Sequence, residues 1–259
     1  MIPENFIEQY SIKWQTLPQT EQDLVISRTL VDLYNEPYIK DALVFRGGTA
    51  LNKLFLKPPA RYSEDIDFVQ KRPEPIGKTI DSIRTLLKPW LGEPQWKITQ
   101  RSAKLIYKYE SINKTPTKLK IEINTTEHFQ VLPLCVEKFE MHSEWFHGFA
   151  DIITYEIDEL MATKLRALYQ RRKGRDLFDV WYVAKQKLID LNRVFDIYSK
   201  YCANDNAHIQ GVDFLNNLAL KKNHPDFQSD MIPLLPRELN WNFEEAYQFV
   251  VDNVVSKLP

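Results

Sequence analysis

The sequence is poor in the residues on which disulfide-rich or membrane proteins depend. Only two cysteines occur among 259 residues, Cys135 and Cys202, and they are far apart and outside any metal-ligand spacing. We therefore expect two free thiols in a reducing compartment, and neither a disulfide framework nor a cysteine zinc site. No apolar run approaches the ~20 residues that span a bilayer, and the start lacks a signal-like segment. These absences predict a cytoplasmic protein with no membrane contact.

The sequence also lacks an excess of charge of one sign. Its formal net charge is -1. A protein that binds nucleic acid over a whole face is usually more basic, so any such contact must come from local patches. The five histidines show no metal-ligand pairing along the sequence, and no serine triad pattern is present. Histidine-based metal chemistry is therefore not expected.

Apolar spacing predicts a first part that mixes helices and strands. Helices are expected over 20–34, with Thr20 and Asp23 as an N-terminal cap, and over 49–55 and 75–90. A buried strand is expected over 42–45. Alternating strands are expected at 65–69, 105–109 and 118–124, with a less regular stretch up to about residue 155.

The last third of the sequence has helical spacing throughout. Helices are expected over 157–170, 177–188, 191–201, 212–221 and 243–257, with Gly174 between the first two. The change in character near residue 156 predicts two domains, residues 1–156 and 157–259.

Three carboxylates form the candidate chemical centre. Side chains of a strand alternate between its two faces, so Asp65 and Asp67 point to one face while Ile66 points into the core. Glu122 lies in a strand with the same alternation, and would join the pair if the two strands are neighbours. Adjacent carboxylates repel one another unless a cation lies between them, and Mg²⁺ prefers such oxygen ligands. A cage of this kind can hold one or two metal ions that bridge a triphosphate and activate an attacking hydroxyl.

The segment before the aspartates strengthens this interpretation. The chain has only seven glycines, and two of them, Gly47 and Gly48, are adjacent between a predicted strand and a short helix that Thr49 begins. Such a turn can bring backbone N–H groups close to phosphates. Isolated Asp-x-Asp or Gly-Gly pairs are common in proteins without metal or nucleotide. The order of strand, Gly-Gly-Thr, helix and Asp-x-Asp is more specific than either part.

A basic segment follows in the helical part. Residues 164–187 carry eight Lys or Arg and two Asp, and helical spacing puts Lys164 and Arg171 or Arg172 near one face. A solvated helix face is the plain explanation, but the local excess favours a phosphate-bearing partner. Asp176 is also explained as an acidic residue in the first turn of a helix. Asp179 is expected to brace an arginine.

These segments together resemble a known family. They are VFRGGTALNK at 44–53, RYSEDIDF at 61–68, KIEIN at 120–124, ELMATKLRAL at 159–168 and RRKGRDLFD at 171–179. They resemble the AbiEii/AbiGii-type nucleotidyltransferase toxins of bacterial toxin–antitoxin and phage-defence systems. Two departures are visible. Thr49 stands where serine often follows the glycines, and the fifteen residues between Thr49 and Asp65 exceed the usual interval.

The resemblance implies an α/β (α+β) nucleotidyltransferase domain with a mixed sheet, followed by a mainly helical C-terminal region that completes the active site. The expected catalytic residues are Asp65, Asp67, Glu122, Lys164 and Asp176, and the first three are the expected metal ligands. The expected nucleotide contacts are Gly47, Gly48, Thr49, Lys53, Ser63 and Lys164. Further RNA or phosphate contacts are expected at Arg61, Arg166, Arg171 and Arg175. Whether Asp176 or Asp179 is the functional aspartate stays open.

The implied activity is transfer of a nucleoside monophosphate from an NTP to an acceptor hydroxyl, with Mg²⁺ or Mn²⁺ as cofactor. RNA, in particular the 3′ end of tRNA, is the expected acceptor, and an antitoxin encoded nearby is the expected partner. One alternative is nucleotidylation of a small molecule, such as an antibiotic, or of a protein. Another is a non-catalytic nucleotide-binding module, which would lack one of the carboxylates or the lysine, and here none is missing.

Overall fold

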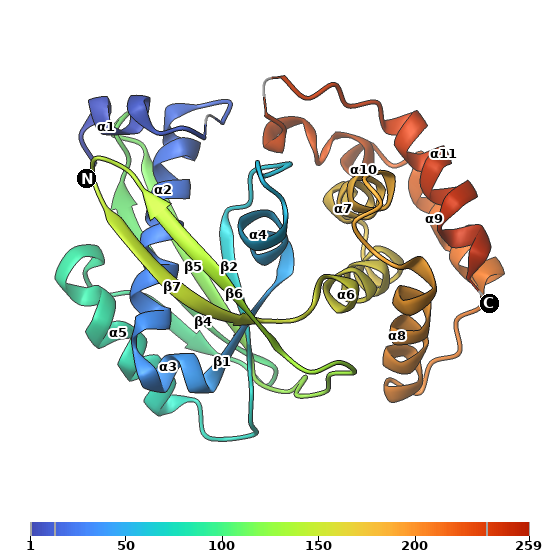
Figure 1. Ribbon diagram of the computed structural model, residues 1–259, viewed down its shortest axis with the longest axis horizontal. Coiled ribbons are helices and arrows are strands. Elements are labelled where there is room, and N and C mark those ends of the chain that lie inside the picture. The colour runs from blue at the N-terminus through green and yellow to red at the C-terminus, as the bar shows by residue number, and fades with distance from the viewer. Residues whose placement is uncertain (1, 13, 237, 259) are drawn as a thin grey trace. The chain divides into compact units, whose positions relative to one another are not determined.

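The chain forms two compact units, Met1–Tyr155 and Glu156–Pro259. The computed structural model describes residues 2–12, 14–236 and 238–258. The first unit combines a sheet with helices, whereas every described element of the second is a helix (Figure 1). Among the described residues, no helix is long and apolar enough to cross a membrane.

The sheet of the first unit has seven strands in the order β3-β4-β5-β2-β1-β7-β6. The strands are β1 (Leu43–Arg46), β2 (Asp65–Gln70), β3 (Gln95–Ile98), β4 (Ser102–Glu110), β5 (Pro116–Asn124), β6 (Cys135–His142) and β7 (His147–Thr154). The pairs β2–β5 and β1–β7 are parallel and the other four are antiparallel. The expected mixed sheet is therefore confirmed.

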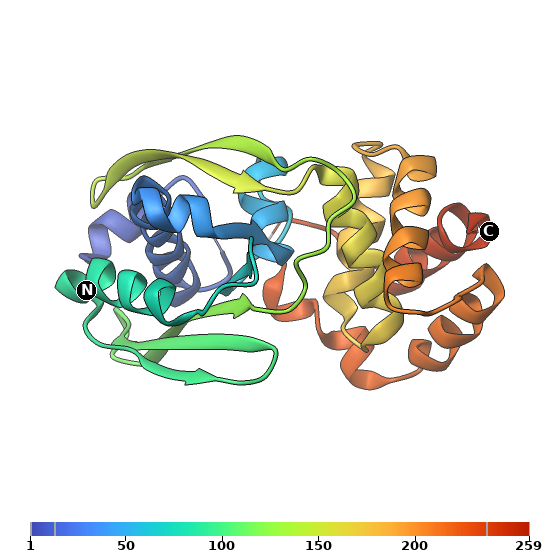
Figure 2. The same ribbon diagram turned by 90° about the horizontal axis from the view of Figure 1, so that it is seen from below.

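The first unit also contains helices. They are α1 (Glu4–Gln9), α2 (Leu17–Asn35), α3 (Pro37–Ala42), α4 (Gly47–Ala50) with the π-helical turn η1 (Leu51–Phe55), and α5 (Gly77–Leu91). Helix α2 contacts β5, β6 and β7, and α5 contacts β4. In Figure 2 the blue and teal helices lie on one side of the green β4 and β5 strands. The apolar residues Leu105 and Ile121 are fully buried on that face.

Helix α2 begins three residues earlier than the spacing predicts. Thr16 is its N-cap, and Thr16 and Gln19 bond to each other's backbone N–H groups as a capping box. Thr20 lies inside the first turn, where its hydroxyl donates to the Thr16 carbonyl. The predicted cap at Thr20 and Asp23 is therefore wrong, because the same residue types recur one turn earlier.

Helix α2 also fixes two strands relative to each other. The Gln22 side-chain amide donates to the Glu64 carbonyl at 3.0 Å and to the Lys118 carbonyl at 3.1 Å. Glu64 directly precedes β2, and Lys118 lies near the start of β5. One buried amide therefore holds both strands just before their acidic residues.

The second unit consists of stacked helices. They are α6 (Ile157–Gln170), α7 (Gly174–Lys185), α8 (Leu191–Asn204), α9 (Gly211–Lys222), α10 (Pro225–Ser229) and α11 (Phe243–Asn253), with the 3-10 turns η2 (Ile232–Leu234) and η3 (Val255–Lys257). Helix α6 contacts α7, α8 and α9, so it is central to the packing. Gly174 is the first residue of α7, and a Cβ there would lie 2.2 Å from the Phe227 carbonyl oxygen, so only glycine fits.

Candidate nucleotide-binding site

The register of two parallel strands brings the three predicted carboxylates together. Asp67 of β2 is the register partner of Glu122 of β5. Register partners share a face of the sheet, and Asp65, two residues before Asp67, shares it too. Ile66 and Phe68 are buried on the opposite face. The three carboxylates therefore lie side by side on the face that the helices α2 and α5 leave uncovered.

Two lysines on the same face offset the charge of these carboxylates. The Lys120 Nζ lies 2.7 Å from Asp65 Oδ2 and 3.5 Å from Glu122 Oε2, and the Lys104 Nζ lies 3.1 Å from Glu122 Oε1. Burial alone would lower the pKa of Lys120, but the hydrogen bond and charge of Asp65, with Asp67 and Glu122, outweigh it and raise that pKa. Both lysines were missed as site residues, although strand alternation puts them on the face of Glu122.

Gly47 allows the turn after β1 to lie directly against Asp67. Its φ is +82°, a region that favours glycine, and a Cβ built there would lie 2.7 Å from Asp67 Oδ2. The residue before it, Arg46, is the register partner of Asp67 in β1 and forms a 3.0 Å ion pair with Glu127. A basic residue thus ends the strand beside the carboxylates, a position that the sequence motif contains but that was not identified as functional.

Arg61 supports the turn and is not a surface contact. Its side chain is among the largest that are fully buried, with 2% exposure, and its Nη1 donates to the Tyr62 carbonyl at 3.0 Å. A Cβ on Gly48 would lie 2.4 Å from Arg61 Nη2, so the guanidinium packs directly under the glycine. The expectation that Arg61 binds RNA or a phosphate stays a prediction, and in this conformation the protein itself surrounds the group.

Thr49 and Ser63 connect the turn to the start of β2. The Thr49 hydroxyl is 2.8 Å from Ser63 Oγ and also donates to the Asp65 carbonyl. Thr49 is 1% exposed, whereas Ser63 is half-buried. Thr49 therefore positions the backbone of Asp65, and Ser63 is the more accessible hydroxyl.

Lys53 points away from the turn and into the interior. Its Nζ forms a 2.7 Å ion pair with Asp23 and lies 2.8 Å from Ser27 Oγ, both on α2. The two charged side chains are only 6% and 2% exposed. The expected contact of Lys53 with a γ-phosphate stays a prediction, and in this conformation the ammonium compensates a buried carboxylate of α2.

In the second unit, Lys164 of α6 is held between two aspartates of α7. Its Nζ lies 3.3 Å from Asp176 Oδ1 and 2.8 Å from Asp179 Oδ2. All three side chains are nearly inaccessible, with exposures between 0% and 7%. Both aspartates that the sequence left as alternatives thus contact the same lysine. Asp179, which was expected to brace an arginine, makes the shorter of the two lysine contacts.

Asp176 is the aspartate that braces an arginine. Arg171 Nε and Nη2 donate to its two carboxylate oxygens at 2.6 and 2.9 Å. Burial would raise the pKa of Asp176, but Lys164 and Arg171 outweigh burial and lower it to about 2. The group is therefore an anion at neutral pH, and half of the Arg171 side chain remains exposed.

The other two arginines expected to contact RNA are engaged within the second unit. Arg166 Nη2 forms a 2.6 Å ion pair with Asp205 and is 13% exposed. Arg175 is half-buried, with its backbone N–H donating to Asp230 at 3.0 Å and its Nε 3.8 Å from the same carboxylate. The expected RNA contacts stay predictions, with little of Arg166 and only part of Arg175 accessible in this conformation.

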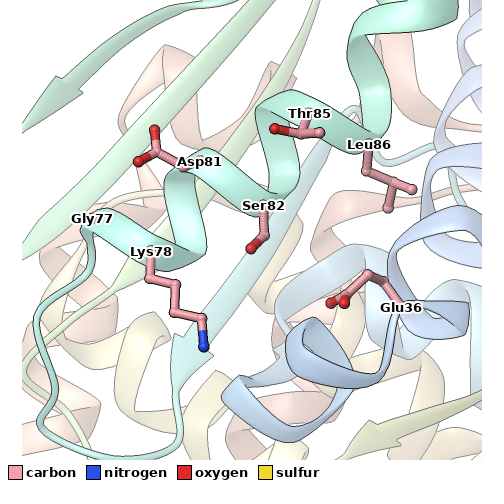
Figure 3. Close-up of a pocket in the computed structure, with 7 residues that line it drawn as sticks. All are labelled: Glu36, Gly77, Lys78, Asp81, Ser82, Thr85 and Leu86. Atoms are coloured by element: carbon pink, nitrogen blue, oxygen red, sulfur yellow. The ribbon is translucent and has the colours of Figure 1, made fainter.

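A separate hollow of about 660 Å³ lies along α5, with Lys78 and Glu36 pointing into it (Figure 3). Its lining mixes both charges with Ser82 and Thr85 and includes none of the predicted site residues. The hollow therefore does not belong to the carboxylate site.

Comparison with protein-family models identifies one family that matches most of the chain. The family model described as "Nucleotidyl transferase AbiEii toxin, Type IV TA system" matches residues 28–249. Among curated proteins, a sequence search found no match.

Two solved structures share the fold. The first is MenT4, a nucleotidyltransferase toxin from Mycobacterium tuberculosis H37Rv, with a TM-score of 0.67 and 16% identity over 98% of this chain and 88% of that one. The second is JHP933 from Helicobacter pylori, with a TM-score of 0.55 and 17% identity over 90% of this chain and 88% of that one. Because the family model spans most of the sequence, including every predicted site residue, the chain belongs to the AbiEii nucleotidyl transferase toxin family and is a nucleotidyltransferase.

Proposed function

We propose that the protein transfers a nucleoside monophosphate from an NTP to an acceptor hydroxyl in a Mg²⁺-dependent reaction. The acceptor oxygen forms a bond to the α-phosphorus, the bond from that phosphorus to the α–β bridging oxygen breaks, and pyrophosphate leaves with the electron pair. The acceptor proton passes to a carboxylate or to water. The observation that carries this proposal is the register pairing of Asp67 with Glu122 beside Gly47.

The residues at this site fit Mg²⁺. Asp65, Asp67 and Glu122 offer only oxygen donors, which Mg²⁺ prefers, and they are about a third exposed or less. When bound, Mg²⁺ would offset the charge of the triphosphate and lower the pKa of the attacking hydroxyl. In this proposal Lys104 and Lys120 exchange their carboxylate partners for phosphate oxygens when the nucleotide binds.

The backbone of the Gly47–Gly48 turn is proposed to hold the phosphates. Both glycines lack a Cβ at points where one would collide with Asp67 or Arg61, so the turn lies directly against these side chains. Ser63, half-buried beside Gly48, is proposed as a hydroxyl donor to the triphosphate. Arg61 and Thr49 act indirectly, because Arg61 packs against Gly48 and Thr49 bonds to the Asp65 carbonyl.

Lys164 of the second unit is proposed to stabilise negative charge on the triphosphate. Two carboxylates hold its ammonium, which limits its rotamers. Asp176 and Asp179 are positioning residues in this scheme, and Arg171 orients Asp176. A lysine with such support presents a fixed point charge, as electrostatic catalysis requires.

We propose RNA, in particular tRNA, as the acceptor, because the uncovered sheet face carries lysines beyond the carboxylates. Lys97, Lys104 and Glu122 are register partners across β3, β4 and β5, and Lys108 lies directly opposite Lys118. Like charges directly opposite each other destabilise a sheet. A bound polyanion such as RNA would relieve that repulsion, whereas a small-molecule acceptor would leave these lysines without a function.

The family description also places this chain among toxins of toxin–antitoxin systems. We propose that the protein acts in the cytoplasm and that its expression inhibits growth of the cell. A cognate antitoxin encoded nearby is proposed to counteract it. A small regulator gene beside the reading frame would support this part of the proposal.

The test is an in vitro transfer assay. The protein is incubated with each α-labelled NTP, Mg²⁺ and total RNA, and the RNA is resolved on a gel. Label on a tRNA band is expected, with loss of at least about 10²-fold in Asp67→Ala. Asp81→Ala, an exposed carboxylate on α5, serves as the matched control and should keep full activity. No transfer by the wild-type chain, together with unchanged growth on expression, would contradict the proposal.

A further inference from the structure

The tip of the β6–β7 hairpin gathers two imidazoles and a carboxylate. Glu140, His142 and His147 each offer one ligand atom, and these atoms all lie within 4.8 Å of one another. The two imidazole rings have centroids 4.2 Å apart, and His142 Nε2 lies 2.6 Å from Glu140 Oε1. The cluster belongs to the first unit and contains none of the residues assigned to nucleotidyl transfer.

The register of the hairpin explains this grouping. His142 and His147 are the last register partners of the β6–β7 ladder, so their side chains leave the same face. Glu140 lies two residues before His142 and shares that face, while Phe139 and Met141 are buried on the other. The sequence was expected to contain no metal-ligand pairing among its histidines. The structure brings His142 and His147 together across two strands, a grouping that spacing along the sequence does not reveal.

The hairpin tip is held in place by its own bonds and by α2. Ser143 and Phe146 close the turn, with the Ser143 N–H donating to the Phe146 carbonyl and the Phe146 N–H donating to Ser143 Oγ, both at 3.0 Å. The Arg28 guanidinium of α2 stacks over the Trp145 and Phe146 rings, with its carbon 5.0 and 5.1 Å from the ring centres. His142 and His147 therefore flank an ordered turn.

A mixed nitrogen and oxygen donor set selects a different ion from the carboxylate site. Two imidazoles and one carboxylate suit Zn²⁺ and related transition metals, whereas Mg²⁺ prefers oxygen donors alone. A tetrahedral ion with three protein ligands keeps one open position. A neighbouring pocket of about 420 Å³ is lined by both histidines together with Tyr10, Ser11 and Glu144. Water or a hydroxyl from that pocket can complete the coordination.

We propose that Glu140, His142 and His147 form a zinc-class metal site, separate from the nucleotidyl-transfer centre. Three ligands come from one hairpin, so the ion would clip β6 to β7 at the end of the ladder. The pocket extends the site to the segment after α1, so the bound ion also lies beside Tyr10 and Ser11.

Zinc titration of the metal-free full-length chain tests the proposal. Isothermal titration calorimetry with ZnSO₄ is carried out in excess Mg²⁺, which occupies oxygen-only sites. We expect one equivalent of Zn²⁺ to bind, with the equivalent lost in His142→Ala/His147→Ala and the affinity lowered at least about tenfold in Glu140→Gln. His208→Ala, an imidazole outside the cluster, should bind as the wild type does.

Two further measurements separate this site from the carboxylate centre and from misfolding. The Asp65→Asn/Asp67→Asn variant should keep the zinc equivalent, and Co²⁺ in place of Zn²⁺ should give the visible absorption of a tetrahedral site that the double histidine variant lacks. Equal circular dichroism spectra verify that the variants are folded. The proposal is overturned if the wild type binds no Zn²⁺ or if the double histidine variant binds it unchanged.

Discussion

At the scale of single residues, the site depends on one glycine that no other residue can replace. Gly47→Ala introduces a Cβ into the space of Asp67 Oδ2 and places alanine at a φ of +82°. We expect a loss of about 1–3 kcal/mol in unfolding free energy and transfer activity reduced at least about tenfold, because the carboxylate must move. Chemical denaturation and the labelled-NTP assay measure both. Gly77→Ala, where nothing lies within 4 Å, is the control that should keep the activity and should not lower the stability.

Lys53 offers a prediction that separates its structural role from the phosphate contact expected from the sequence. Lys53→Met leaves Asp23 buried without this cation, and removal of one partner of a buried pair costs about 3–5 kcal/mol. The structural role predicts a strong loss of stability in urea, whereas the KM for NTP in the remaining folded protein should not change. A raised KM at unchanged stability would restore the phosphate contact.

At the scale of secondary-structure elements, replacing one lysine of the pair between β4 and β5 should raise stability and weaken RNA binding. Lys108→Glu converts a like-charge pair with Lys118 into an opposite-charge pair, worth about 0.2–1 kcal/mol of stability. The same change should lower the affinity for RNA and flatten its salt dependence. Thermal unfolding and RNA binding at several salt concentrations test it. A variant that is more stable and binds RNA as well as the wild type would contradict an acceptor surface here.

The elements also show how far sequence reasoning extends. Strand alternation predicted that Asp65 and Asp67 share a face and that Glu122 joins them if the two strands are neighbours, and the register of β2 with β5 meets that condition. Edge strand β3 was missed because all four of its residues are exposed and leave no apolar alternation. The buried positions of Lys53 and Arg61 were not predicted, because a long cationic side chain can turn to solvent or to a buried partner and local spacing does not decide which. The partner of Lys53, Asp23, is thirty residues away.

At the scale of the whole molecule, the ion pairs around Asp176 predict a pH dependence of stability. The folded-state pKa of about 2 lies below the ordinary value of 3.8, so the unfolded chain binds the proton more tightly. The stabilisation is therefore present above about pH 4 and is lost as the pH falls towards 2, by about 2 kcal/mol. Urea unfolding at several pH values between 6 and 2.5 gives the free energy of unfolding as a function of pH. This free energy should fall less steeply with decreasing pH in Asp176→Asn than in the wild type. Equal slopes would contradict the lowered pKa.

The Gln22 amide affects which fraction of the folded molecules is active. A slip of β5 by two residues against β2 would keep Leu119, Ile121 and Ile123 on the buried face. It would, however, set Lys120 or Asn124 in place of Glu122 opposite Asp67. Such a molecule would be folded and inert, so the active fraction of a preparation can fall below its folded fraction. The Gln22 side chain bonds to the carbonyls of Glu64 and Lys118, and so favours the register in which Glu122 lies opposite Asp67. A correctly folded molecule is then also one with an intact carboxylate site.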